Sequence, residues 1–168
     1  MLSCGVNTDK PVYPLFTLFN PVQSPALVSI RPYAVWTTNL EYKIEFDLSY
    51  YITNQEPQFQ GYNLLISTTS TSAQNTGFGT VTYLPNGVEP SFLHIGATPS
   101  TASSSLITQR VTNFKAPPSP LPFQLCEKYY FRLQAVTSNG LRSNTGNQIE
   151  SCAIMDNTLC RKGTVCNP

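Results

Sequence analysis

The sequence predicts an all-β protein whose strands form an antiparallel sandwich. Short segments in which apolar and polar residues alternate recur along the chain, and turn-forming residues stand between them. Helical periodicity is not evident, so we expect essentially no α-helix. A succession of short strands and turns favours two antiparallel sheets over a parallel sheet with crossover helices.

The two clearest strands are expected at residues 41–50 and 129–137. In residues 41–50 every even position is apolar and every odd one polar, which predicts one buried face and one wet face. Residues 129–137 alternate in the same way and end in Ser138-Asn139-Gly140, where Asn and Gly suit a tight reversal. Residues 60–67 place Tyr62, Leu64 and Ile66 on one face. Further strands are expected at residues 26–30, 79–84, 92–95, 106–114 and 148–154, with Pro85-Asn86-Gly87 as a turn.

One pattern resembles a known family. Tyr-x-Phe-x-Leu-x-Ala-Val-x-x-x-Gly, at residues 129–140, resembles strand F and the F–G turn of fibronectin type III domains, and Gly61-Tyr62 resembles the start of their strand C. The resemblance implies an immunoglobulin-like, fibronectin type III-like β-sandwich at residues 25–155, with long insertions between strands C and E. The chain departs from the family in strand B, where Phe46 occupies the expected core position and Trp36 falls in the preceding segment.

Composition indicates a surface-displayed or secreted protein. Charged residues make up only 11% of the 168-residue chain, against about 25% in an ordinary domain, and Ser, Thr, Asn and Gln supply the polarity. The net charge is +1 and the charges are scattered, so nucleic-acid binding is not expected. No apolar run is long enough to span a bilayer.

The N-terminus resembles the end of a bacterial lipoprotein signal. In Met1-Leu2-Ser3-Cys4-Gly5 a small residue precedes a Cys and Gly follows it, which indicates lipidation of Cys4; the alternative is a free or disulfide-bonded Cys. Residues 1–24 are then a tether between anchor and folded domain. The chain has no N-x-[ST] sequon, which also suits a bacterial protein. We therefore expect an extracytoplasmic location in a bacterial cell envelope, as an outer-membrane lipoprotein or at the cell surface.

The chain has five cysteines, and lipid on Cys4 would leave four for two disulfides. Cys126 and Cys152 are equally distant in sequence from residue 139, in the predicted F–G turn, so antiparallel pairing about that point would place them opposite each other. Cys160 and Cys166 would then close a small loop in a C-terminal tail, residues 156–168. Four sulfurs allow three pairings, and a metal site competes with all of them. The chain offers no CxxC for a metal, and its single His is far away in sequence.

The sequence offers no convincing active site. His94 alternates with apolar neighbours, as an ordinary strand residue does. Glu45 and Asp47 share the polar face of one predicted strand, where carboxylates are normally solvated and paired across strands. We therefore expect no enzymatic activity, no cofactor, and no catalytic or metal-binding residues.

The predicted outward face of strand F is the candidate contact surface. Tyr130 lies there between Lys128 and Arg132, a combination that suits a protein contact or a sugar-stacking platform. The alternative is a cross-strand cation–π pair that only covers the sheet. Two Ser/Thr-rich stretches, residues 67–76 and 98–105, are either contact loops or solvated spacers. The prolines of residues 117–122 form either a polyproline ligand or a rigid corner before strand F.

These observations predict a non-enzymatic cell-envelope lipoprotein whose fibronectin type III-like domain mediates protein–protein binding or adhesion at the cell surface. One alternative is a structural subunit of an envelope or appendage assembly. Another is an accessory carbohydrate-binding module that stacks sugars on exposed aromatic rings. The expected partners are thus proteins or glycans, together with the membrane through the anchor on Cys4.

Overall fold

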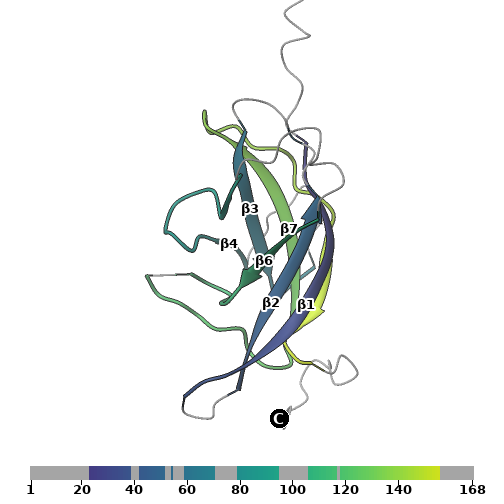
Figure 1. The fold of residues 1–168 in the computed structure, drawn as a ribbon, viewed down its shortest axis with the longest axis vertical. Helices are drawn as coiled ribbons and strands as arrows, with labels where there is room; N and C mark the ends of the chain where they lie inside the picture. Colours follow the sequence, from purple (N-terminus) through teal and green to yellow (C-terminus); the bar gives the residue numbers. More distant parts are fainter. Residues whose placement is uncertain are drawn as a thin grey trace, which may run out of the picture.

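The computed structural model describes residues 23–38, 42–51, 54, 59–70, 79–94, 106–116 and 118–155. Over these residues the chain forms eight strands in two antiparallel sheets and no helix, which confirms the predicted all-β class. The two sheets pack on each other as a sandwich-like structure. Figure 1 shows the three-stranded sheet lying across the larger one. The predicted contact loops at 67–76 and 98–105 lie mostly or wholly outside the described residues.

The smaller sheet has the order β1-β2-β6, with β1 at Ala26–Trp36, β2 at Tyr42–Tyr51 and β6 at Leu106–Val111. The predicted buried face of β2 is confirmed, because its even-numbered apolar residues from Ile44 to Tyr50 are almost completely buried. The predicted wet face is wrong for Glu45 and Ser49, which are also buried. β1 continues past the predicted end at Ile30 and includes Pro32. Pro32 is tolerated because β1 lies at the sheet edge, where a missing backbone N–H breaks no ladder.

The larger sheet has the order β4-β3-β7-β8, with β4 at Thr80–Tyr83, β3 at Phe59–Ser67, β7 at Lys128–Thr137 and β8 at Ile149–Cys152. The short β5, Phe92–Leu93, also pairs with β3. The predicted turn between β4 and β5 is confirmed, since the Gly87 amide donates to the Leu84 carbonyl at 3.0 Å. β4 and β5 pair with opposite ends of β3.

Aromatic rings fill the space between the sheets. Phe46 of β2 is fully buried, and its ring meets those of Phe123 and Phe131 edge-on, with centroids 4.7 and 5.0 Å apart. Tyr50 contacts Tyr62 in the same way at 5.1 Å. Such edge-to-face pairs stabilise beyond their buried area. The two sheets therefore share one continuous core, to which β2 contributes from one side and β3 and β7 from the other.

The start of β3 depends on a glycine. A Cβ on Gly61 would clash with the backbone carbonyl of Phe92 and would lie 2.8 Å from the Pro90 ring. Any other residue there would displace β5 from β3. The Gly-Tyr pair that marked this strand in the sequence is thus explained by the close approach of two backbones.

The β7–β8 hairpin has a shifted register. Near the turn the Ser143 amide donates to the Ala135 carbonyl, in the predicted register centred on residue 139. Further along, Phe131 pairs with Ile149 and Lys128 with Cys152, so the register has moved by two residues. Between these two parts the Gly146 amide still donates to the Leu133 carbonyl at 2.7 Å, and the next residue, Asn147, bonds to the other sheet. The side-chain amide of Asn147 accepts from the Leu27 N–H at 2.9 Å and donates to the Leu27 carbonyl at 2.8 Å.

This shift corrects the prediction that Cys126 and Cys152 lie directly opposite each other. Cys152 faces Lys128, the first residue of β7. Cys126 lies just before this strand, and its amide donates to the Ala153 carbonyl at 3.2 Å. Both cysteines are buried in a small cluster with Ile154. Their direct pairing stays a prediction. Cys4, Cys160 and Cys166 lie outside the described residues.

The proline-rich segment before β7 folds back on itself. The Lys115 and Leu121 backbones exchange hydrogen bonds of 3.2 and 3.0 Å, which close a short loop. Pro118, Pro120 and Pro122 are exposed around this loop. Such a closed loop agrees with the rigid-corner interpretation of these prolines.

Candidate binding surface

The two cations of the predicted contact surface, which lies on β7, bind to other groups of the same chain. The Lys128 ammonium lies 2.9 Å from the Glu150 carboxylate, which raises the pKa of Lys128. The Arg132 guanidinium donates to the Gly146 carbonyl at 2.7 Å, and desolvation lowers its pKa. Tyr130 lies between them and is partly buried. The three predicted residues do lie on one outward face, but their polar groups serve the β7–β8 hairpin.

The middle of that outward face, on β3, is also covered. On β3 the side chains that point away from the core are Asn63, Leu65 and Ser67, since Tyr62, Leu64 and Ile66 belong to the core. Asn63 is only 1% exposed and Leu65 only 7%. Outward residues this inaccessible must be covered by other parts of the chain. We call this side of the larger sheet the covered face.

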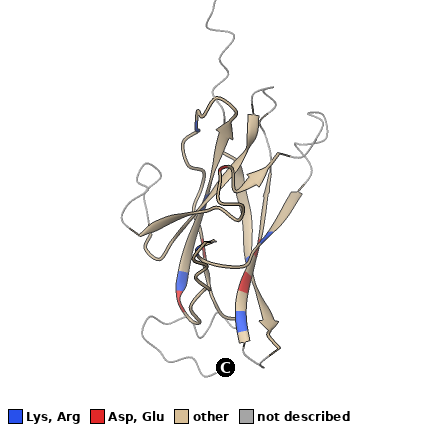
Figure 2. Ribbon diagram, turned by 90° about the vertical axis from the view of Figure 1, so that its left-hand side faces the viewer, with Lys and Arg blue, Asp and Glu red and all other residues tan. Residues whose placement is uncertain are grey.

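The outward side of the smaller sheet is different, and we call it the open face. Its side chains come from alternate positions of β1, β2 and β6, which the register brings side by side. They include Ser29, Arg31, Tyr33, Val35, Lys43, Glu45, Asp47, Ser49, Tyr51, Leu106, Thr108 and Arg110. Figure 2 shows how few charged residues the ribbon carries altogether. Five of the side chains on the open face are charged.

Arg110 is the centre of the open face. Its Nε and Nη2 atoms donate to the two carboxylate oxygens of Asp47, each at 2.8 Å, and this pairing raises the pKa of Arg110. The guanidinium also lies over the Tyr33 ring, 3.9 Å from its centroid. A bidentate ion pair stacked on an aromatic ring holds a long side chain in one position. Tyr33 itself remains 45% exposed.

The predicted role of Glu45 and Asp47 is confirmed in part. Both carboxylates are paired: Asp47 with Arg110, and Glu45 with the Lys43 ammonium at 2.8 Å. The expectation that both would be solvated was wrong for Glu45, which is only 6% exposed. It is buried because it stands on the central strand, with Tyr33 directly opposite on β1 and Lys43 and Arg110 on either side.

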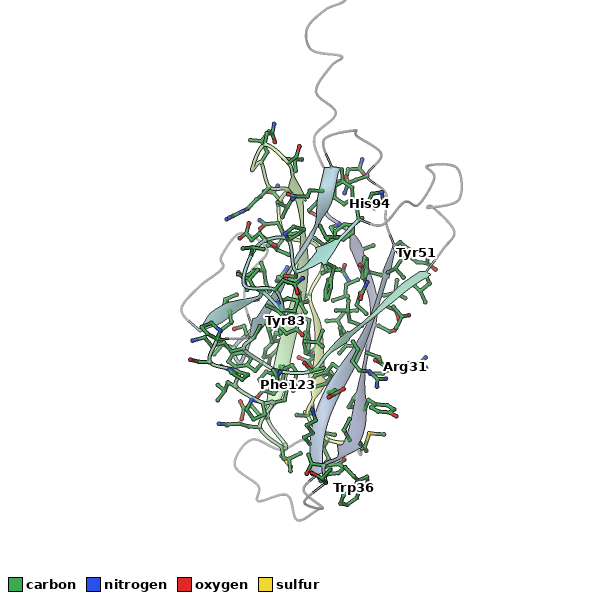
Figure 3. The ribbon with its side chains drawn as sticks, turned by 60° about the vertical axis from the view of Figure 1, so that its left-hand side comes forward. Arg31, Trp36, Tyr51, Tyr83, His94 and Phe123 are labelled. Atoms are coloured by element: carbon green, nitrogen blue, oxygen red, sulfur yellow. The ribbon has the colours of Figure 1, made fainter. Side chains whose placement is uncertain are left out.

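The other end of the open face is apolar. Tyr51 and Leu106 lie opposite each other across β2 and β6, and both are exposed. Ser49 and Thr108, between these residues and the charged group, share a hydrogen bond of 3.1 Å. Figure 3 shows Tyr51 and Arg31 along the same side of the sheet. The open face therefore offers an aromatic–arginine group and an apolar pair on one rigid surface.

One aromatic pair stands apart from this face. Trp36, at the end of β1, is 66% exposed and meets Tyr42 edge-on with ring centroids 5.4 Å apart. Figure 3 shows Trp36 at the lower end of the molecule. An exposed Trp held by a second ring can stack on an apolar or sugar surface.

The described residues contain no cluster of His, Cys, Asp and Glu that could hold a metal ion. His94 follows β5, where its amide donates to the Gln60 carbonyl at 2.9 Å and its ring contacts Phe59 edge-on at 4.8 Å. The described part of the chain contains no helix that is long and apolar enough to cross a bilayer.

The sequence did not single out Arg110 or Tyr33. Arg110 is the one charged residue of β6, and Tyr33 falls in a stretch that the pattern did not assign to a strand. Their importance follows from the strand order, which brings residues from three separate segments together. One signal in the sequence pointed to this group. Two carboxylates on one strand, Glu45 and Asp47, require cations nearby, and a neighbouring strand could supply one of them.

A family model described as LIC11073-like matches residues 3–168, nearly the whole chain. The chain belongs to the LIC11073-like family. No curated protein and no solved structure matches the chain. The function of this LIC11073-like protein is therefore inferred from its own residues. Among these, the open face is the best candidate for a binding surface.

Proposed function

We propose that this protein is a non-enzymatic binding module of a bacterial cell envelope and that its open face is the surface that contacts a protein partner. The observation that carries the proposal is the contrast between the two sheets. The outward residues of β3 are almost inaccessible, whereas Tyr33, Tyr51 and Leu106 remain exposed on the smaller sheet. Among the described outward residues of the two sheets, those of the open face combine access with a fixed arrangement of side chains.

The chemistry of the open face suits protein recognition. Tyr and Arg dominate the energetics of protein interfaces, especially where they are already held in place. Arg110 is fixed by Asp47 and by the Tyr33 ring, so binding would cost little side-chain entropy. The neighbouring Tyr51 and Leu106 add apolar area that a partner could cover.

We further propose that the sandwich is immunoglobulin-like and similar to fibronectin type III domains. Two observations support this proposal. Strands β1, β2 and β6, in the positions of A, B and E, share one sheet. Strands β3, β7 and β8, in the positions of C, F and G, share the other, as in immunoglobulin-like folds. At the start of β7 the Tyr129 hydroxyl accepts a hydrogen bond of 2.8 Å from the Gln124 amide, in the manner of a tyrosine corner.

The envelope location is proposed from the sequence. A lipidated Cys4 would tether the domain through residues that lead into β1, and Trp36 at the other end of β1 would then point away from the membrane. Mass spectrometry of the protein from native membranes tests this, because acyl chains on Cys4 are expected and an unmodified Cys4 would remove the anchor.

Capture from native envelope extracts tests the open face. The purified chain is immobilised, and captured proteins are identified by mass spectrometry for the wild type, Tyr33→Ala and Tyr130→Ala. Tyr33→Ala should reduce recovery of a specific partner at least tenfold, because it removes an exposed ring and the support of Arg110. Tyr130→Ala, on the covered face, is the matched control and should leave recovery unchanged. Equal effects of the two substitutions would refute the assignment.

A second candidate function rests on Trp36. If this exposed ring stacks on sugars, the protein is an accessory carbohydrate-binding module. A glycan array separates the two functions: glycan binding that Trp36→Ala abolishes and Tyr33→Ala leaves intact would favour carbohydrate recognition.

A further inference from the structure

Strand β6 is a sheet edge that lacks the usual protection. It pairs with β2 on one side, and none of the described strands pairs with its other side. An exposed strand edge offers a row of free backbone N–H and C=O groups to another strand. Proteins normally block such edges with proline, charged side chains (above all lysine), bulges or very short strands. The one charged residue of β6, Arg110, is paired with Asp47 of its own sheet.

The remaining edges carry such devices. β1 contains Pro32 and an irregular register after Leu27, whose backbone N–H and C=O are both taken by the Asn147 side chain. β4 and β8 contain only four residues each. β6 runs for six residues, Leu-Ile-Thr-Gln-Arg-Val, with no proline, lysine or bulge. Its Leu106 is exposed beside this open edge.

We propose that β6 pairs antiparallel with β6 of a second copy of this chain, about a two-fold axis at Thr108. Opposed residues of an antiparallel pair lie on the same side of the sheet. An axis at Thr108 therefore places Thr108 opposite itself and Leu106 opposite Arg110 of the second copy. Two three-stranded sheets become one six-stranded sheet in which the two open faces are continuous.

The charges on β6 fit this pairing. Arg110 is its one charged residue, and the two copies of Arg110 lie at opposite ends of the paired segment. Four residues of separation correspond to about 13 Å along a strand, beyond the Debye length of about 8 Å at physiological salt. Each guanidinium is also neutralised by its own Asp47 at 2.8 Å. Thr–Thr pairs across strands are favourable.

The contact itself is small. Pairing of six-residue strands covers less than the roughly 1,000 Å² expected of a stable interface, so the dimer should be weak and concentration-dependent. The inference does not depend on the partner proposed for the open face, because it rests on the backbone of β6 and on the side chains that flank it.

Sedimentation velocity of the full chain over a hundredfold concentration range tests the proposal. The wild type should shift from monomer to dimer. Thr108→Lys should raise the dissociation constant at least tenfold, because it sets two ammonium groups face to face at the axis. Thr82→Lys, which adds the same charge on the β4 edge, is the matched control and should dimerise like the wild type. Thermal unfolding establishes that both variants are folded.

A chemical cross-link tests the register. Thr108→Cys should form a disulfide-linked dimer under mild oxidation, and Thr82→Cys should not. A wild type that stays monomeric throughout, or equal weakening by the two lysine variants, would overturn the proposal. Loss of a captured envelope protein on Thr108→Lys, with a monomeric wild type, would also overturn it and assign the edge to another protein's strand. Loss of that partner on Tyr33→Ala would still support the open face.

Discussion

Alkaline pH should destabilise the fold through one buried tyrosine. Burial raises the pKa of the Tyr50 hydroxyl to about 12, from 10.0 in an unfolded chain, although a hydrogen bond with Gln109 opposes this. Because the folded pKa is the higher one, the stabilisation is complete below pH 10 and is lost as the pH rises toward 12. At pH 11 about nine-tenths of the unfolded chains have lost this proton, against about one-tenth of the folded ones. The resulting loss is about 1.4 kcal/mol.

Thermal unfolding at pH 8 and pH 11 measures this loss. For a chain of this length, about 1.4 kcal/mol corresponds to a fall in Tm of about 3–6 °C. Tyr50→Phe removes the titrating group, so it should be less stable than the wild type at pH 8, by about 1 kcal/mol for the lost hydrogen bond. Its disadvantage should then disappear at pH 11. Tyr33→Phe, on the open face, is the matched control. If the gap between wild type and Tyr50→Phe were the same at both pH values, the buried hydroxyl would not carry the effect.

Two further predictions concern the core and the cysteines. Phe46→Ala should cost about 3–5 kcal/mol in urea unfolding, because its ring is fully buried against Phe123 and Phe131. Phe46→Leu should cost less than about 1.5 kcal/mol, because it keeps most of the apolar volume; equal costs would mean that the ring contacts, and not the apolar volume, carry the stabilisation. Alkylation before reduction should leave Cys126 and Cys152 unmodified, since we predict that both are disulfide-bonded. Peptide mapping without reduction then decides their pairing, and a bond from either one to another cysteine would replace the predicted Cys126–Cys152 link.

The strands could be predicted because their two faces meet different surroundings. The alternation in β2 and β7 reports directly which side chains the core takes, and both strands lie within a residue of their predicted limits. β1 was predicted too short, because its second half contains Pro32 and an exposed Tyr33. That half is held by pairing with β2, which no local pattern in β1 reveals.

The candidate surface was predicted on the other sheet, and the reason is physical. A Tyr flanked by two cations looks like a contact surface wherever the outward face of its strand is free. Here the β7–β8 hairpin supplies an acceptor for each cation, Glu150 for Lys128 and the Gly146 carbonyl for Arg132. Which of two outward faces the chain covers depends on loops and register, and neither can be read from alternation.

The bridge between Asn147 and Leu27 has a consequence for synthesis on the ribosome. It joins backbone groups near the start of the domain to a side chain 120 residues later. During translation β1 can pair with β2, but the Leu27 N–H and C=O on its other edge have no Asn147 to bond until the β7–β8 hairpin has been synthesised. The nascent sandwich therefore completes its closure only when almost all of the domain has emerged. Contacts of such long sequence separation are characteristic of slowly folding β proteins.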